Sequence, residues 1–191
     1  MQAIKTLLTS LLVAAFVAAG ACAAEGVGAE RRLPVVAIPD YCQSNGVVSV
    51  KRSMAEAILK AGCLPVLLPE MEDPAVDQFL SQCDAVMVGG GIKGQDYPRR
   101  CAYEGRVIAL AAKRGLPIVG ICHGCQVINL HFGGTIAPGF RVTARAEDGV
   151  IEAIEHETLP IFGFQFHPEI YWKKDARCLE LLRLALRGKR K

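Results

Sequence analysis

One cysteine of this chain has the neighbours that a catalytic nucleophile needs. Cys122 ends an apolar run and opens a helix-like segment, and Gly120 and Gly124 stand two residues to either side of it. This spacing is typical of a nucleophile elbow, a tight strand-to-helix turn in which crowding by neighbouring backbone favours glycine. The turn would place the thiol at a helix N-terminus, where the helix dipole favours negative charge. The alternative interpretation is a buried cysteine at the end of a strand.

A histidine and a glutamate could complete a catalytic set with this thiol. His167 and Glu169 flank Pro168 at the end of the apolar run 161–167, which we expect to be a strand that the proline helps to end. Residues two apart on a strand point to one face, so the two side chains could meet. A histidine near a thiol can act as base and then as acid, while the glutamate fixes its tautomer. Taken alone, the pair could also be a hydrogen-bonded pair at the surface.

Three consecutive glycines offer backbone donors for a developing negative charge. Gly89, Gly90 and Gly91 follow the apolar run 85–88, which we expect to be another strand. Backbone amides of Gly90 and Gly91, together with the amide of His123 after the nucleophile, could form an oxyanion hole. The alternative is a tight turn with no further role.

The segments that would position these residues alternate between strands and helices. Their apolar runs and helical spacing predict strands at 33–38 (ended near Pro39), 64–68, 85–88 and 116–121, and helices at 50–61, 74–80, 104–114 and 123–132. Strands without polar alternation are typical of a parallel sheet that helices cover on both faces. Open sheets of this kind bind ligands at the carboxyl ends of their strands, where the elbow would lie.

The pattern changes in the last third of the chain. Segments 140–145 and 150–154 alternate apolar and polar residues around the turn signal Asp148-Gly149, which predicts an antiparallel hairpin. The strand 161–167 and an amphipathic helix at 173–186 follow. The predicted fold is therefore α/β, with a mostly parallel open sheet and helices on both faces. It is a flavodoxin-like three-layer sandwich with an added antiparallel hairpin.

The first 23 residues have the order of a secretory signal peptide. Lys5 precedes an uncharged apolar run at 7–19, and small residues follow at 20–24, so we expect cleavage after Ala23. The run is shorter than the ~20 residues that a membrane span needs. A retained signal anchor and a lipoprotein site at Cys22 are the alternatives. We expect an exported protein, periplasmic or secreted, whose residues 24–191 form one domain.

Composition excludes several other classes of protein. The 191 residues are 51% hydrophobic and 21% charged, as in an ordinary folded protein, and the net charge is only +3. The chain has no basic face with interleaved aromatic residues, so nucleic-acid binding is not predicted. The four histidines have no spacing that matches a closed Cys/His metal site, so no metal is expected. Cys122 and Cys125 form a Cys-x-x-Cys pair, which leaves a thiol redox protein as an alternative.

In this order, the motifs resemble those of the class I glutamine amidotransferase superfamily. The resemblance rests on the glycine-flanked cysteine and glutamine at 120–126, on Gly-Gly-Thr at 133–135 and on Phe-His-Pro-Glu at 166–169. The segment 55–69 also resembles one branch, the γ-glutamyl hydrolases of the peptidase C26 group, which includes γ-glutamyl-γ-aminobutyrate hydrolase. The resemblance covers about residues 33 to 175.

The resemblance implies a function and the roles of individual residues. Cys122 would attack a γ-glutamyl amide, with His167 as base and Glu169 as its orienting partner. Oxyanion donors would lie near Gly90 and at His123. Release of the amine and hydrolysis of a glutamyl thioester would follow, with a small-molecule γ-glutamyl substrate and no metal or organic cofactor. The oligomeric state is not indicated.

The resemblance also suggests that Gln126 binds the γ-glutamyl group, but several positions depart from the pattern. His123 replaces the usual arginine, Cys125 the usual methionine and Ile92 a common aspartate. The interval 135–164 spans only 30 residues and lacks a histidine-rich substrate-proximal segment. Two other functions therefore remain alternatives: a glutaminase subunit that feeds a synthetase, and a non-catalytic binding protein on the same fold.

Overall fold

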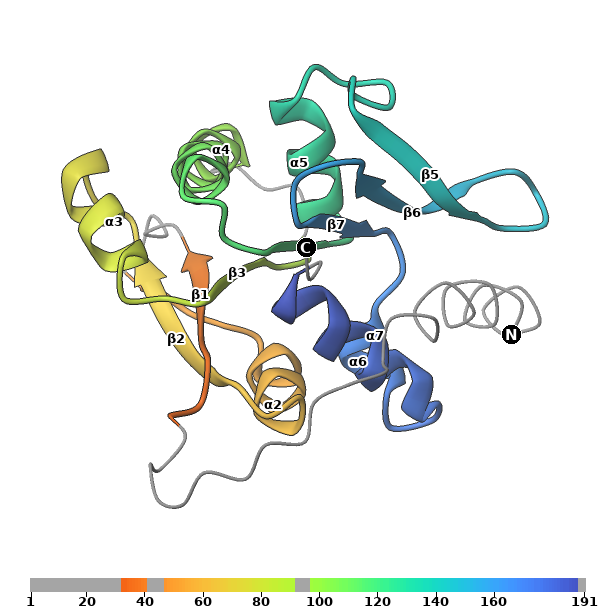
Figure 1. Cartoon of the computed structure of the whole chain (residues 1–191), viewed down its shortest axis with the longest axis horizontal. Helices are drawn as coiled ribbons and strands as arrows, with labels where there is room; N and C mark the ends of the chain where they lie inside the picture. The colour runs from red at the N-terminus through yellow and green to blue at the C-terminus, as the bar shows by residue number, and fades with distance from the viewer. Residues whose placement is uncertain (1–31, 41–46, 92–96, 189–191) are drawn as a thin grey trace, which may run out of the picture.

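The structure, a computed structural model, describes residues 32–40, 47–91 and 97–188 of the chain (Figure 1). These residues form one seven-stranded sheet in the order β2-β1-β3-β4-β7-β6-β5. The strands are β1 (Val35–Asp40), β2 (Leu64–Pro69), β3 (Ala85–Val88), β4 (Ile118–Ile121), β5 (Phe140–Arg145), β6 (Ile151–His156) and β7 (Ile161–Phe164). The helices are α2 (Arg52–Lys60), α3 (Asp73–Leu80), α4 (Tyr97–Lys113), α5 (His123–His131), α6 (Pro168–Tyr171) and α7 (Ala176–Arg187).

The sheet confirms the predicted mixture of strand directions. Strands β2, β1, β3, β4 and β7 are parallel to their neighbours in that order, whereas β6 runs antiparallel to both β7 and β5. The hairpin β5–β6 thus extends the parallel sheet at one edge, as the alternating pattern of its residues predicted. The chain passes from β2 across β1 to β3, so strand order reverses beside the carboxyl ends of β1 and β3.

Helices cover both faces of the sheet, as the unbroken apolar strands required. Helices α2, α6 and α7 lie on one side, and α3, α4 and α5 lie on the other (Figure 1). On the first side, Ile58 and Leu182 pack with Ile121 in one apolar cluster. On the second side, Val107 and Ile128 belong to a cluster with strand residues of the opposite sheet face. This three-layer arrangement confirms the predicted fold class.

The first strand continues past the proline that was expected to end it. Pro39 lies inside β1, and the strand ends at Asp40. Pro39 is in register with Leu68 of β2, but the pairing of β1 with β3 covers only Val36 and Ala37. The missing N–H of Pro39 therefore removes no ladder hydrogen bond toward β3, which is why proline is tolerated there.

One helix begins earlier than its apolar pattern indicated. We expected a helix at 104–114, but α4 begins at Tyr97. Pro98 is tolerated because N–H groups in the first turn of a helix have no intrahelical partner. The early turns carry arginines, and Arg100 turns inward to the buried Glu104. Polar residues that face a buried partner do not give an amphipathic pattern, so this part of the helix was missed.

The segment around Pro168 is helical, although we expected a strand that ends there. Strand β7 ends at Phe164, and Pro168 begins the short helix α6 because proline fits the first position of a helix. The expected helix 173–186 instead begins at Ala176. The side chain of Asp175 caps it by accepting a hydrogen bond from the backbone N–H of Arg177.

The sheet brings three functional segments to one edge. The glycines 89–91 follow β3, Cys122 follows β4, and residues 165–169 follow β7. Because β3, β4 and β7 are adjacent and parallel, their carboxyl ends lie next to one another. Motifs that are far apart in the sequence, from residue 89 to residue 169, therefore meet in the fold.

Some predictions fall on residues that the structure does not describe. The expected signal peptide at 1–23, with Cys22, lies outside the described residues, and so does Ile92. Across residues 32–40, 47–91 and 97–188, no helix has the length and apolar character needed to cross a membrane.

Candidate active site

The backbone at Cys122 has the strained conformation of a nucleophile elbow. Its φ of 53° and ψ of −104° lie where residues other than glycine are uncommon. Two backbone hydrogen bonds hold it there: Cys122 N–H donates to the carbonyl of Phe164 at 2.7 Å, and Gln126 N–H donates to the carbonyl of Cys122 at 3.2 Å. Strain of this kind persists when the surrounding structure fixes it, and it is concentrated at functional sites.

The two glycines that flank the elbow are required by backbone contacts. A Cβ on Gly120 would lie 2.6 Å from the carbonyl carbon and oxygen of Gly124. A Cβ on Gly124 would overlap the carbonyl oxygen of Val88 in β3. Backbone atoms cannot move aside as a flexible side chain can. The spacing that predicted the elbow therefore has a steric cause at both positions.

His167 and Glu169 meet, but not in the way that the sequence predicted. His167 Nδ1 lies 2.7 Å from Glu169 Oε1, and Glu169 is 1% exposed. The two residues are not on a strand, because β7 has already ended at Phe164. Pro168 starts α6, whose first turn brings the carboxylate of Glu169 back to the imidazole of the residue that precedes the helix.

This pairing prepares the imidazole for proton transfer. A carboxylate only accepts hydrogen bonds, so His167 Nδ1 carries the proton and Nε2 is left to act as a base. The second oxygen, Glu169 Oε2, is buried and has no hydrogen-bond partner among the described residues. Glu169 is therefore placed to fix the orientation of the His167 imidazole.

Gly90 links the thiol, the imidazole and the glycine loop. A Cβ on Gly90 would lie 3.0 Å from His167 Cε1 and 3.4 Å from Cys122 Cβ. The loop after β3 therefore touches both members of the predicted pair. Gly91 is placed differently, because a side chain there would overlap the guanidinium of Arg100 instead. Of the two predicted oxyanion glycines, Gly90 is the one whose added Cβ would lie next to Cys122 and His167.

Two amide side chains lie beside the nucleophile. Gln165 Nε2 donates to Cys122 Sγ at 3.8 Å, and Gln126 Nε2 donates to Gln165 Oε1 at 3.2 Å. Gln126 was predicted to bind substrate, whereas the role of Gln165 was missed. Gln165 was interpreted as part of a strand that ran to His167. Its position two residues before that histidine was the only available signal.

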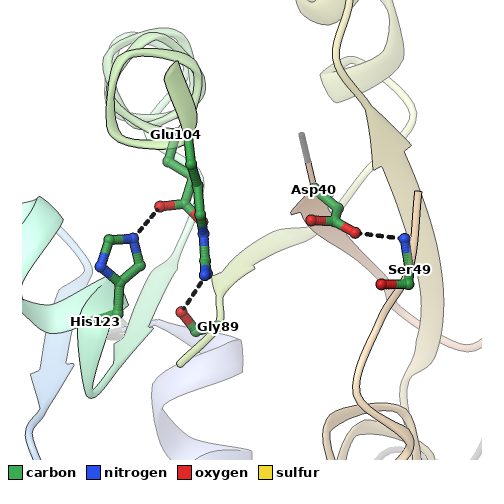
Figure 2. A network of polar contacts seen from close by, with 6 residues as sticks. Asp40, Ser49, Gly89, Glu104 and His123 are labelled. Carbon is green, nitrogen blue, oxygen red and sulfur yellow. Dashed lines mark hydrogen bonds and ion pairs between the residues drawn. The ribbon is translucent and has the colours of Figure 1, made fainter. Parts of the chain in front are cut away.

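The side chain of His123 belongs to a buried polar network. His123 Nε2 lies 2.7 Å from Glu104 Oε2, and both side chains are at most 2% exposed. Arg100 Nε donates to Glu104 Oε1 at 2.8 Å, and Arg100 NH2 donates to the carbonyl of Gly89 at 3.1 Å. Figure 2 labels Gly89, Glu104 and His123 of this network. Only the backbone of His123, at the start of α5, is left to serve the oxyanion hole. No role for Arg100 or Glu104 was predicted from the sequence.

Another polar contact lies at the end of β1 in the same view. Asp40, the last residue of the strand, accepts a hydrogen bond from the backbone N–H of Ser49 (Figure 2). The contact ties the end of β1 to a residue that precedes α2.

The second cysteine of the Cys-x-x-Cys pair is a structural residue. Cys125 is buried and free, and burial, helped by the neighbouring Cys122, raises its pKa to about 12. Its sulfur packs closely on β7, since a Cβ on Gly163 would lie only 2.7 Å from it. An attacking thiol must ionise readily, so Cys125 is not suited to be the attacking thiol of a redox pair.

Other candidate sites are weaker. Among the described residues, no cluster of three His, Cys, Asp or Glu side chains could hold a metal ion. A groove of about 490 Å³ lies between α4 and α5, lined by residues that include Cys101, Arg106, Leu130 and His131. None of the predicted catalytic residues lines this groove.

Comparison with known proteins supports the assignment of the motifs. The family model described as Peptidase C26 matches residues 34–138 and 135–169. The matched ranges include the glycine loop, the elbow and the His-Pro-Glu segment. They also include α4, which carries Arg100 and Glu104.

Several curated proteins are similar to this chain. It is 26% identical over 180 residues to a glutamine-hydrolyzing GMP synthase subunit of Methanospirillum hungatei, covering 72% of this chain and 87% of that protein. It is 32% identical over 97 residues to the corresponding GMP synthase subunit of Thermococcus kodakarensis, covering 29% of this chain and 52% of that protein. It is 35% identical over 133 residues to a provisionally named glutamine amidotransferase of Mycobacterium tuberculosis, covering 58% of this chain and 42% of that protein. The chain thus spans about half the length of some curated relatives.

A solved structure shares the fold. A protein from Thermoplasma acidophilum, provisionally described as a subunit of GMP synthase, superposes with a TM-score of 0.60 at 17% identity. The match covers 81% of this chain and 96% of that one. At this identity the likeness concerns the fold alone.

Proposed function

Because this chain belongs to the Peptidase C26 family, within the class I glutamine amidotransferase-like superfamily, we propose that it hydrolyses γ-glutamyl amide bonds through a thioester on Cys122. The observation that carries the proposal is the position of Gly90, where an added Cβ would meet both Cys122 and His167, next to the buried Glu169. This arrangement joins a nucleophile, a base and a backbone donor at one sheet edge.

In the first step, the sulfur of Cys122 attacks the carbonyl carbon of the γ-glutamyl amide. His167 Nε2 takes the thiol proton, and Glu169 stabilises the resulting imidazolium. Negative charge develops on the carbonyl oxygen, where the backbone N–H groups of Gly90 and His123 are the proposed donors. No metal or cofactor takes part in this scheme.

In the second step, the tetrahedral intermediate collapses to a thioester. The imidazolium of His167 gives its proton to the leaving amine, and the C–N bond breaks. Water then attacks the thioester while His167 accepts a proton from it. The carboxylic acid leaves, and the thiol of Cys122 is restored.

The substrate's γ-glutamyl group is proposed to bind next to the two glutamine side chains. Gln165 contacts the sulfur and Gln126 contacts Gln165, so both amides line the space beside the nucleophile. Amide groups both donate and accept hydrogen bonds, which suits an amino acid head group that carries an ammonium and a carboxylate. The amine leaving group is not specified by these contacts. We further propose that the domain works after export, because its first 23 residues have the order of a signal peptide.

A second candidate function is supply of ammonia from glutamine to a partner enzyme. The match that covers 87% of the Methanospirillum hungatei protein, which is named as glutamine-hydrolyzing, favours it. The two functions differ in whether the chain needs a partner. A hydrolase turns over glutamine or γ-glutamyl amines alone, whereas a dependent glutaminase releases ammonia only in a complex.

The test is turnover of a chromogenic γ-glutamyl anilide and of glutamine by the reduced protein. Cys122→Ala should abolish the activity, since loss of a nucleophile removes orders of magnitude in rate. Cys101→Ala is the matched control, because it removes a partly exposed thiol of α4 that is outside the site. Equal activity in Cys122→Ala and the parent would refute the proposal. Activity that appears only with an added synthetase would favour the second candidate.

A further inference from the structure

The geometry points to Arg100 and Glu104 of α4 as positioning residues that hold both halves of the oxyanion hole in place. The inference rests on the proposed function, because it concerns the groups that would stabilise the tetrahedral intermediate. Neither side chain contacts the sulfur or the imidazole of His167 in any described interaction. Their effect would be transmitted through the backbone of Gly89, Gly90 and His123.

The first half is fixed through one peptide group. Arg100 NH2 donates to the carbonyl oxygen of Gly89 at 3.1 Å. That carbonyl and the N–H of Gly90 belong to the same planar trans peptide, so they point in opposite directions. Holding the carbonyl of Gly89 toward α4 therefore turns the N–H of Gly90 away from α4. Gly90 is the residue whose added Cβ would meet Cys122 and His167.

The second half is fixed through the side chain of His123. Glu104 Oε2 lies 2.7 Å from His123 Nε2, and the carboxylate can only accept, so this nitrogen carries a proton. The imidazole anchors the first residue of α5, whose backbone N–H follows the nucleophile. Rotation of that residue would change the direction of its N–H. The contact with Glu104 therefore restricts the second proposed donor.

Glu104 joins the two halves with its two oxygens. Oε1 accepts from Arg100 Nε at 2.8 Å, while Oε2 contacts His123 (Figure 2). The side chains of Arg100, Glu104 and His123 are 14%, 1% and 2% exposed. In such a poorly hydrated environment, hydrogen bonds are strong and each group depends on the others. One carboxylate thus sets the relative placement of the glycine loop and the elbow.

Gly91 makes room for this network. A side chain at position 91 would overlap the guanidinium of Arg100. Arg100 therefore lies across the loop and contacts it at its first and third glycines. This gives Gly91 a steric function, whereas Gly90 supplies the donor.

Removing only one partner of a buried ion pair destabilises the fold, because the other charge stays buried without compensation. Changes at Arg100 or Glu104 are therefore expected to lower stability as well as rate. Fixed donors aimed at a developing charge are worth ~10²–10³ in rate for each donor. We therefore expect these changes to lower acylation even where the protein remains folded.

The test compares two reactions of Cys122 that differ in their need for an oxyanion hole. In the first, the thiolate attacks the acetyl carbonyl of p-nitrophenyl acetate, a C–S bond forms, and p-nitrophenolate leaves. In the second, the thiolate displaces iodide from iodoacetamide, and no oxyanion forms. Rates of both are measured in single turnover for the parent, Arg100→Ala, Arg100→Lys, Glu104→Gln and Arg99→Ala. Arg99 is the neighbouring arginine on α4, and it pairs with Glu70 at the surface.

We expect Arg100→Ala to lower acylation by ~10²–10³ and to leave alkylation nearly unchanged. Added guanidinium should restore part of the acylation in this variant. Arg100→Lys and Glu104→Gln keep most of the side-chain volume and replace Arg100→Ala in the test if that variant does not fold; they should show smaller losses in the same reaction. Arg99→Ala should match the parent in both reactions.

Each contrary result has a separate meaning. Acylation that is unchanged in Arg100→Ala and Glu104→Gln, or that falls in parallel with alkylation, would overturn the positioning role. A parent that is acylated by p-nitrophenyl acetate but never cleaves a γ-glutamyl anilide would overturn the proposed substrate. In that case the acylation rates still decide the positioning role. A parent that accepts neither acyl donor would overturn both.

Discussion

Glu169→Gln should separate the catalytic role of this carboxylate from its structural role. The side chain is 1% exposed, and one of its two oxygens has no hydrogen-bond partner among the described residues. Glutamine has nearly the same shape and can still accept a hydrogen bond from His167 Nδ1. The substitution therefore removes the negative charge and keeps the packing.

The loss of rate should appear in the acylation step, because His167 becomes positively charged in that step. Removing one member of a buried, hydrogen-bonded ion pair costs ~3–5 kcal/mol. At about 1.4 kcal/mol for each factor of ten, this corresponds to a loss of ~10²–10⁴ in the rate of acylation. With neutral His167 there is no ion pair to lose, and a costly buried charge disappears. The free energy of unfolding should thus stay the same or rise.

The assay measures kcat/KM for a γ-glutamyl anilide and the free energy of unfolding in urea. Glu155→Gln is the matched control, because Glu155 is a buried carboxylate of β6 that pairs with Arg141 away from the thiol. The control should retain activity. A loss of less than about tenfold in Glu169→Gln with normal stability would refute the role of Glu169 as partner of the imidazolium. If kcat/KM falls together with the free energy of unfolding, the carboxylate is structural.

Three further predictions concern the elbow and its surroundings. Gly124→Ala should destabilise the protein by ~1–3 kcal/mol or more, because its Cβ overlaps the carbonyl of Val88; an unchanged urea midpoint would contradict the steric argument. Burial raises the pKa of Glu152 above its ordinary value of 4.5, so the folded state binds this proton more tightly than the unfolded state does. Stability should therefore fall as pH rises from about 4.5 to the raised pKa of the folded protein. Glu152→Gln should flatten this part of the stability profile, and an identical profile would argue against a buried carboxyl. Because burial raises the pKa of Cys125 to about 12, iodoacetamide at neutral pH should label Cys122 much faster than Cys125 by mass spectrometry; comparable labelling would contradict the burial of Cys125.

The sheet could be predicted because its strands carry clear patterns. Continuous apolar runs such as 85–88 need helices on both faces, and the alternation at 140–145 needs one face exposed. Both patterns follow from burial, which depends on side chains that the sequence displays directly. The ends of two strands were predicted wrongly, and a proline lies at each of these positions. Pro39 is tolerated within β1 and Pro168 starts a helix, and both outcomes depend on neighbours that the local sequence does not show.

The candidate site could be predicted in part, because its residues form short motifs. Two glycines with a steric cause mark the elbow, and His167 and Glu169 are close in sequence. The network of Arg100, Glu104 and His123 could not be predicted in the same way. Its members come from two helices and act through contacts across 19 residues of sequence, and no spacing rule indicates such a contact. Polar residues in α4 resembled a loop because the sequence does not show their partners.

The strained elbow also explains why its catalytic partners lie so close. Cys122 keeps its unfavourable φ because three neighbours hold the turn: its N–H is bonded to Phe164 of β7, Gly124 packs on Val88 of β3, and His123 is anchored to α4. Each of these elements continues into a functional segment. Strand β7 leads to the proposed base, β3 leads to the glycine loop, and α4 carries the arginine that contacts this loop. The contacts that fix the nucleophile therefore also fix the groups that act with it, so the geometry of the site is set by the same packing that forms the sheet edge.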